Sequence, residues 1–214
     1  MATYLKELEC PRCKKKADPS KLHNLCECGT PYLVRYDLAK MAKEVDPKVF
    51  SKRPEGLWRY QELLPVVDPK NRITLGEGGT PVYQVPKLAQ EYGLKELWIK
   101  DEGFNPTGTF KARGAAVGVS RAKELGVKTV AMPTNGNAGA AWAAYCTRVG
   151  LKMVVAMPED APATTQAECM AYGADTYLVK GLISDAGRVI KEAAAKNGWF
   201  EAATLKEPYR IEGK

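Results

Sequence analysis

The chain has 214 residues, of which 45% are apolar and 27% charged, a composition typical of a soluble globular protein. Its formal charge of +7 fits an anionic substrate or weak nucleic-acid contact and selects neither. No segment approaches the ~18 consecutive apolar residues needed to cross a membrane, and residues 1–8 lack the apolar core of a secretory signal. We therefore expect no membrane association and a cytoplasmic location, where thiols stay reduced.

The first part of the chain is rich in cysteine. Cys10-Pro-Arg-Cys13 is followed, after twelve intervening residues, by Cys26-Glu-Cys28, and two close thiolate pairs suit tetrahedral zinc. Residues 1–36 therefore predict a zinc-ribbon-like module stabilised by a structural Zn²⁺, with Cys10, Cys13, Cys26 and Cys28 as ligands. Four reduced thiols without a metal, or a disulfide, remain open alternatives. His23 lies within the loop and could replace one thiolate, although a solvated His is the commoner situation.

Residues 37–74 contain Pro47, Pro54, Pro65 and Pro69, which predict a linker with short helices only. From residue 75 onward, short apolar runs alternate with helical patterns, and a glycine suited to a C-terminal cap follows each of four helices: Gly126, Gly150, Gly173 and Gly198. This rhythm predicts an α/β fold with a parallel sheet and helices on both faces. Cys146 and Cys169 lie on two of the helices and are expected to be buried thiols. The predicted strands span 96–100, 128–132, 152–157, 175–179 and 199–202, and the predicted helices 110–125, 138–149, 164–172 and 185–196.

A lysine stands at the start of the first of these helices. Residues 105–111, Asn-Pro-Thr-Gly-Thr-Phe-Lys, form a tight turn in which Thr109 is a suitable N-cap and Lys111 falls in the first helical turn. The positive end of the helix dipole lowers the pKa of a lysine there and favours the neutral amine, which attacks aldehydes. A solvated helix lysine is the alternative.

A second loop follows the strand predicted at 128–132. Residues 133–139, Pro-Thr-Asn-Gly-Asn-Ala-Gly, open the next helix, and free backbone N–H groups at such a position bind carboxylates or phosphates. The alternative is a plain βα turn in which Asn and Gly serve backbone freedom. The loop is not a dinucleotide fingerprint, because it lacks Gly-x-Gly-x-x-Gly.

Together with Leu75-Gly-Glu-Gly-Gly-Thr-Pro81, these two loops resemble the tryptophan-synthase-β superfamily of pyridoxal-phosphate enzymes (fold type II), and most closely its threonine synthases. The resemblance implies that Lys111 holds pyridoxal 5'-phosphate as a Schiff base and shuttles the proton. It also implies that Asn137 bonds the phenolic oxygen of the cofactor. The remaining implied site residues are Phe110, which packs beside the lysine; Thr134, Asn135 and Gly136, which bind the substrate carboxylate; and Glu77, near the site entrance. Two residues depart from the family pattern. Ala112 stands where the family commonly has Asp, and Asn135 stands where it often has Ser.

The resemblance also implies a reaction and an organisation. O-phosphohomoserine and water would give threonine and phosphate, with the cofactor ring stabilising a carbanion. Residues 75–122 would belong to the larger cofactor domain, 123–205 would form the small βαβ domain, and 206–214 would begin the return to the larger one. The family's phosphate-binding glycine loop lies further downstream, so we expect an N-terminal half that is inactive or weakly active alone. The full-length enzyme would be a homodimer, or a separate C-terminal chain would complement this one.

Two other functions remain open. One is another lyase or replacement enzyme of the same superfamily, similar to threonine dehydratase or cysteate synthase. The other is a non-catalytic zinc-ribbon protein that binds nucleic acid through Lys14, Lys15 and Lys16, which leaves both loops unexplained and lacks clustered aromatic residues for base stacking.

Overall fold

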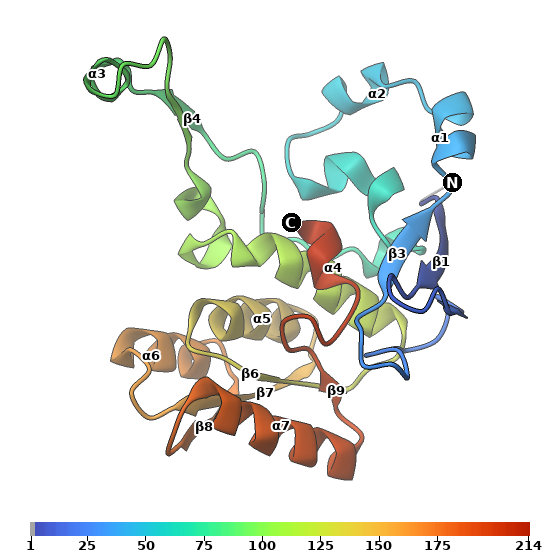
Figure 1. The fold of residues 1–214 in the computed structure, drawn as a ribbon, viewed down its shortest axis with the longest axis vertical. Coiled ribbons are helices and arrows are strands. Elements are labelled where there is room, and N and C mark those ends of the chain that lie inside the picture. Colours follow the sequence, from blue (N-terminus) through green and yellow to red (C-terminus); the bar gives the residue numbers. More distant parts are fainter. Residues whose placement is uncertain (1–2) are drawn as a thin grey trace.

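The computed structural model describes residues 3–214 and is built around a four-stranded parallel sheet (Figure 1). The strand order is β8-β7-β6-β9, and each neighbouring pair is parallel. Val130 of β6 stands opposite Met153 of β7 on one side and Phe200 of β9 on the other. The strands are β6 (Thr129–Pro133), β7 (Lys152–Pro158), β8 (Asp175–Val179) and β9 (Phe200–Glu201).

Helices cover both faces of this sheet, as the sequence predicts. Helices α5 (Asn137–Arg148) and α6 (Ala163–Ala171) lie on one face, and α7 (Ile183–Asn197) lies on the other (Figure 1). Side chains alternate along β6, so Val130 and Met132 join the core under α5 while Ala131 packs with α7. The glycines that follow the four helices all adopt positive φ, between 67° and 82°, which confirms the predicted C-terminal caps.

Helix α4 (Lys111–Glu124) forms a further layer on α5. It is rich in Ala and Gly, and most of its residues from Ala112 to Ala122 are buried. A Cβ atom at Gly118 would lie 2.4 Å from the ring of Trp142, so only glycine permits this approach of α4 to α5. Small side chains therefore fix how deeply the lysine helix sits.

The cysteine-rich module is a small antiparallel sheet of order β2-β1-β3, made of β1 (Leu5–Glu9), β2 (Lys16–Ala17) and β3 (Leu33–Tyr36). Its own core contains Leu8, Val34 and, from the other end of the chain, Tyr209. The connector carries only short helices, as predicted: α1 (Leu38–Glu44), α2 (Lys48–Ser51), η1 (Leu57–Leu63) and η2 (Pro69–Asn71).

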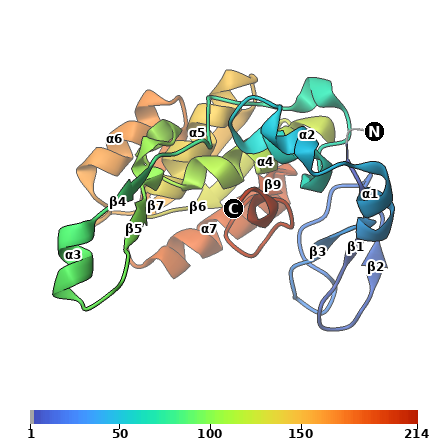
Figure 2. The same ribbon diagram turned by 90° about the horizontal axis from the view of Figure 1, so that it is seen from above.

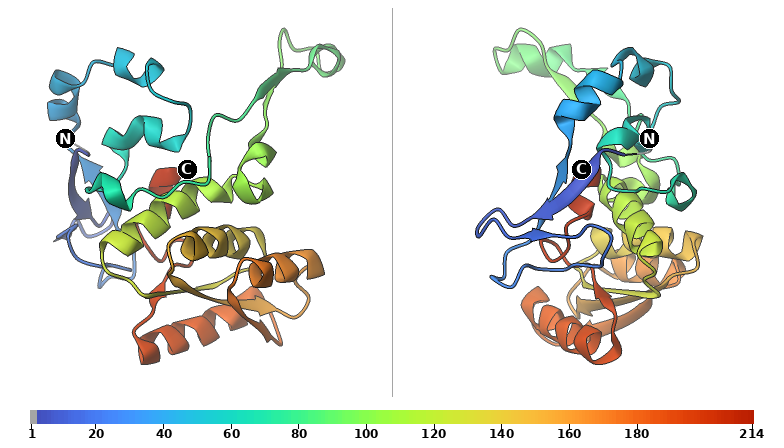
Figure 3. Two further views of the ribbon diagram at one scale, coloured as in Figure 1. Left: turned by 180° about the vertical axis from the view of Figure 1, so that it is seen from behind. Right: turned by 90° about the vertical axis from the view of Figure 1, so that its right-hand side faces the viewer.

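The strand predicted at 96–100 lies outside the parallel sheet. Strand β5 (Trp98–Lys100) pairs antiparallel with β4 (Val82–Gln84), and α3 (Pro86–Glu91) connects them. The three elements form an arm that projects from the body (Figures 2 and 3). This difference from the expectation has two reasons. Residues 82–84 offer a nearby pairing partner, and both faces of the two-stranded ribbon are exposed, whereas a strand of a parallel sheet is buried on both faces.

Two single turns, η3 (Glu102–Phe104) and η4 (Pro106–Gly108), lead from the arm into α4. After β9 the chain returns to α4 and ends in η5 (Arg210–Gly213), which packs against that helix. None of the helices within residues 3–214 is both long enough and apolar enough to cross a membrane.

Candidate active site

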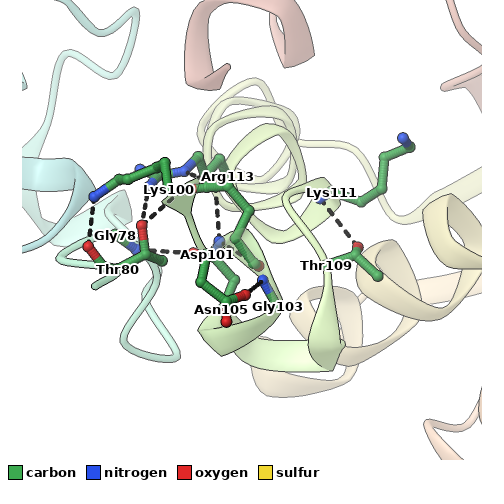
Figure 4. A network of polar contacts seen from close by, with 10 residues as sticks. Gly78, Thr80, Lys100, Asp101, Gly103, Asn105, Thr109, Lys111 and Arg113 are labelled. Atoms are coloured by element: carbon green, nitrogen blue, oxygen red, sulfur yellow. Dashed lines mark hydrogen bonds and ion pairs between the residues drawn. The ribbon is translucent and has the colours of Figure 1, made fainter. Parts of the chain in front are cut away.

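Lys111 is the first residue of α4, as the sequence predicts. The predicted cap is one residue off, because Phe110 occupies the N-cap position with helical backbone angles. Thr109 still contributes, since its Oγ1 accepts the backbone N–H of Lys111 at 3.1 Å (Figure 4). The preceding turn is strained, because Thr107 adopts a φ of 63°, a left-handed conformation that few non-glycine residues take.

The amine of Lys111 has no polar partner within residues 3–214. Its Nζ lies 3.7 Å from the centroid of the Phe110 ring, and Figure 4 shows the side chain pointing away from the neighbouring polar network. Burial, and then the positive charge of Arg210, lower the pKa of Lys111. The predicted direction is therefore found, although burial and Arg210 cause it. A half-buried amine with a lowered pKa and no carboxylate partner suits a nucleophile.

Glu102 ties the lysine loop to the glycine-rich segment 75–81. Its carboxylate receives two hydrogen bonds from Arg113, at 2.6 and 2.8 Å, and one from the Thr80 hydroxyl at 2.7 Å. The Asn105 amide also donates to it at 2.9 Å, while Asn105 Oδ1 accepts the N–H of Gly78 at 3.0 Å. The paired Arg113 guanidinium, above all, lowers the pKa of Glu102 to about 2. Two motifs recognised separately in the sequence thus form one rigid unit.

The asparagine loop joins β6 to α5. Thr134 is buried, and its Oγ1 accepts the N–H groups of Gly136 and Gly139, both at 3.1 Å. Gly136 has a φ of 147°, and a Cβ there would lie 2.6 Å from the side chain of Thr165, so glycine is required. The side chains of Asn135 and Asn137 are exposed. Amide side chains and a helix N-terminus therefore meet at one place, which suits an anion.

The family resemblance implies that Glu77 lies near the site entrance, whereas the structure places it in the interior. Its side chain is 1% exposed and accepts the Tyr145 hydroxyl at 2.5 Å and the N–H of Leu75 at 3.1 Å. Burial and the Glu77 charge raise the pKa of Tyr145 far above its usual range. Glu77 thus fastens segment 75–81 to α5, and a direct role toward substrate stays a prediction.

The lysine loop and the asparagine loop belong to packed elements. Turn η4, which precedes Lys111, contacts α5, and α4 packs along the same helix. Within residues 3–214, no hydrogen bond joins Lys111 to Asn135 or Asn137. The structure therefore brings the two helices together and leaves their site side chains unlinked.

The four cysteines of the N-terminal module converge. The sulfurs of Cys10 and Cys28 lie 3.5 Å apart, as do those of Cys13 and Cys26, and all four fall within 4.8 Å of one another. Tetrahedral zinc with Zn–S bonds of ~2.3 Å needs sulfur separations of about 3.8 Å, so this donor set fits the ion. His23 lies outside the cluster and faces the backbone oxygen of Asp18. All six cysteines are free, and Cys146 and Cys169 are buried as predicted.

The returning segment contains a buried ion pair that the sequence did not predict. Arg210 is 4% exposed, and its Nε donates to Glu207 at 3.1 Å while Nη1 donates to Thr204 at 3.0 Å. Its guanidinium lies 5.0 Å from the centroid of the Trp142 ring. The only sequence signal was the three-residue spacing of Glu207 and Arg210, which is common on protein surfaces.

The family model described as "Pyridoxal-phosphate dependent enzyme" matches residues 73–214. The chain belongs to this family. It is also 41% identical to the threonine synthase of Methanocaldococcus jannaschii over 206 residues, which cover 96% of this chain and 51% of that protein. It is 40% identical to the threonine synthase of Halalkalibacterium halodurans over 162 residues, 74% of this chain and 44% of that one. The chain thus spans about half the length of the curated relatives it matches.

Solved structures support the fold. Maize serine racemase superposes with a TM-score of 0.57 at 27% identity, over 63% of this chain and 41% of that chain. Diaminopropionate ammonia lyase from Escherichia coli gives a TM-score of 0.59 at 20% identity, over 65% of this chain and 43% of that chain. At this identity the match shows similarity of fold alone. The chain is thus an α/β protein of the pyridoxal-phosphate fold type II class.

The residues of this chain fit pyridoxal phosphate at its aldehyde end. Lys111 offers an amine with a lowered pKa and no polar partner, which is what condensation with an aldehyde requires. Asn135 and Asn137 present exposed amides at the start of α5. The donor chemistry of the lysine and asparagine loops therefore agrees with the family.

Proposed function

We propose that this chain forms the lysine-bearing half of a threonine synthase, which converts O-phosphohomoserine and water to threonine and phosphate. The observation that carries the proposal is the 41% identity to a threonine synthase over 96% of the chain, together with an unpaired lysine at the start of α4. An amino-acid substrate suits the exposed amides of the asparagine loop, which are hydrogen-bond donors for a carboxylate.

In this mechanism each residue has a separate task. Lys111 would hold the cofactor through its amine, and the same amine would take and return the proton at the substrate α-carbon. Its lowered pKa favours the neutral amine, which is the form able to accept that proton. Pyridoxal phosphate, when bound, supplies an electron-withdrawing ring that stabilises negative charge at this carbon.

The asparagine loop orients the substrate and the cofactor. Asn137 would donate to the phenolic oxygen of the cofactor, and Thr134, Asn135 and Gly136 would form the site for the substrate carboxylate. The Oγ1 of Thr134 already accepts two N–H groups of the loop, so its contribution is to fix the loop's shape. Phe110 packs beside the lysine amine and limits its freedom.

We further propose that residues 75–122 belong to a larger cofactor domain completed by sequence that this chain does not contain, and that 123–205 form the smaller domain. The projecting arm supports this division, because large apolar side chains on or beside it are exposed: Trp98 54%, Tyr92 69% and Phe104 66%. A two-stranded ribbon of this kind is marginal alone, so covering by a further sheet or helix would stabilise it. The complete enzyme would be a homodimer or a complex with a complementing C-terminal chain.

Residues 1–36 would form a zinc-ribbon-like module with a structural Zn²⁺ at Cys10, Cys13, Cys26 and Cys28. Convergence of four sulfurs within 4.8 Å supports the ion, and four thiolates leave no open position for catalysis. Metal analysis of the purified protein should give about one zinc per chain, and Cys13→Ser together with Cys26→Ser should abolish it. Unchanged metal content in the double variant would contradict the assignment.

Cofactor attachment tests the central proposal. The protein is incubated with pyridoxal phosphate and reduced with borohydride, and the modified lysine is located by peptide mass mapping. We expect label at Lys111 and its loss in Lys111→Ala, with the exposed-site variant Lys128→Ala as control. Labelling of the 214-residue chain should be weak and should rise when a C-terminal half is supplied.

Product analysis identifies the reaction. A complete enzyme carrying these residues should release phosphate and threonine from O-phosphohomoserine, and Lys111→Ala should remove that activity. Deamination of threonine in place of phosphate release would indicate a dehydratase. Full activity of the Lys111→Ala variant would refute the proposed mechanism.

A further inference from the structure

The segment from Glu201 to Gly213, here called the strap, runs from the parallel sheet back across α4. Its last turn, η5, approaches that helix closely. A Cβ at Gly213 would lie 2.2 Å from the backbone oxygen of Arg113, and one at Gly114 would lie 2.9 Å from the backbone oxygen of Arg210. Two glycines thus let two backbones touch within three residues of Lys111.

Lys214, just after the strap, has its Nζ 5.2 Å from the centroid of the Phe110 ring, and Arg210 is the strap residue whose charge reaches the lysine. Its guanidinium is fixed by Glu207, by Thr204 and by the backbone oxygen of Ala202, and it lies on the ring of Trp142. From this position its charge contributes to the lowered pKa of Lys111. Movement of the strap would therefore change the charge surrounding the lysine amine.

The cysteine-rich module holds the other side of the strap. The Asn24 amide donates to the backbone oxygens of Glu201 and Lys206, at 2.7 and 2.9 Å. The Tyr36 hydroxyl donates to Glu212 at 2.9 Å, and Tyr209 is fully buried in the core of the module. The strap is thus enclosed between the module and the lysine helix.

An ion held by the four cysteines would fix the position of Asn24. Asn24 lies in the loop between Cys13 and Cys26. The backbone of this loop takes part in regular β-pairing only at the short strand β2 and at an isolated bridge between Leu25 and Pro31. In so small a module, an ion shared by the two cysteine pairs supplies most of the folding energy. Loss of the ion would release this loop, and with it the two hydrogen bonds of Asn24.

We propose that the cysteine module anchors the strap, and that an ion bound by the four cysteines keeps Arg210 in place as a positioning residue for Lys111. This inference rests on the proposed role of Lys111, and it adds a long-range link from a structural ion to the lysine. The ion takes no part in the chemistry and acts through the strap.

Hydrogen exchange tests the anchor directly. The 214-residue protein is compared with and without a zinc chelator, and in the variant Asn24→Ala, by mass spectrometry of peptides. Amides of 201–213 should exchange at least about tenfold faster after chelation and in Asn24→Ala, because the hydrogen bonds that hold the strap are lost. Exchange of α7 peptides should not change after chelation or in Asn24→Ala. Exchange of the strap should not change in the control variant Asn197→Ala, because the exposed amide of Asn197 donates to the backbone oxygen of Ala193 in its own helix.

Reactivity of the lysine tests the positioning role. Labelling of Lys111 by an acylating reagent is followed against pH and mapped by mass, which gives its pKa without cofactor. The pKa should rise toward the ordinary lysine value after chelation and in Asn24→Ala, and stay unchanged in Asn197→Ala. The metal content of Asn24→Ala should equal that of wild type.

Unchanged exchange of the strap and unchanged labelling of Lys111 after metal removal would overturn the inference. If chelation accelerates exchange in every peptide, the exchange of the strap in Asn24→Ala becomes the deciding measurement, because the four cysteines are intact in that variant. Failure of the proposed function has a different signature, since pyridoxal phosphate would then not attach to Lys111 even while the strap responds to metal.

Discussion

Glu102 joins two loops through four side-chain hydrogen bonds, and replacing it by Gln removes the charge while keeping its size. The difference between its ordinary pKa of 4.5 and the value of about 2 corresponds to about 3.4 kcal/mol at 1.36 kcal/mol per pKa unit. The side chain is partly exposed, so solvent screening reduces the contribution to about 1–2 kcal/mol. We expect Glu102→Gln to lower the free energy of unfolding at pH 7 by that amount.

The effect should depend on pH in a defined direction. The folded-state pKa of Glu102 is depressed, so its contribution is present above the unfolded value of 4.5 and is lost as pH falls toward about 2. The stability difference between wild type and Glu102→Gln should shrink by more than half between about pH 5 and about pH 3. Urea unfolding at a series of pH values measures it, with the exposed-site variant Glu192→Gln as control. Equal stability at pH 7, or a difference that persists unchanged at pH 3, would refute the reasoning.

Two further substitutions test the packing around the lysine helix, and a third serves as their control. Gly118→Ala should cost about 1–3 kcal/mol in urea unfolding, because the new methyl group meets the Trp142 ring at 2.4 Å. Gly187→Ala is the matched helical control, since its nearest neighbour is 3.9 Å away, and it should be neutral or stabilising by up to about 1 kcal/mol. Tyr145→Phe removes a donor from buried Glu77 and should destabilise by about 1–3 kcal/mol; wild-type stability would show that this hydrogen bond is not needed.

Local sequence signals predicted the parts of the fold that are set locally. Alternation of apolar runs with helical patterns gave the βα order, and Gly126 and Gly198 marked helix ends because only glycine adopts positive φ there easily. The start of α4 at Lys111 and the grouping of four cysteines likewise follow from short spacings. These features need no knowledge of distant residues.

Features set by tertiary contacts were not visible in the sequence. The antiparallel pairing of β5 depends on β4, on the far side of α3, and the burial of Glu77 depends on Tyr145, 68 positions away. The lowered pKa of Lys111 was assigned to the helix dipole, whereas burial and Arg210, which lies about a hundred residues away in the chain, cause it. No local pattern encodes such encounters.

The projecting arm has a practical consequence for anyone who purifies this polypeptide. Its two-stranded sheet has no third strand on either side within residues 3–214, so both outer edges offer unpaired backbone groups beside large apolar rings. Edges of this kind recruit strands from neighbouring molecules. Concentrated samples should therefore oligomerise and lose material during storage, and coexpression with a chain that covers the arm should improve recovery.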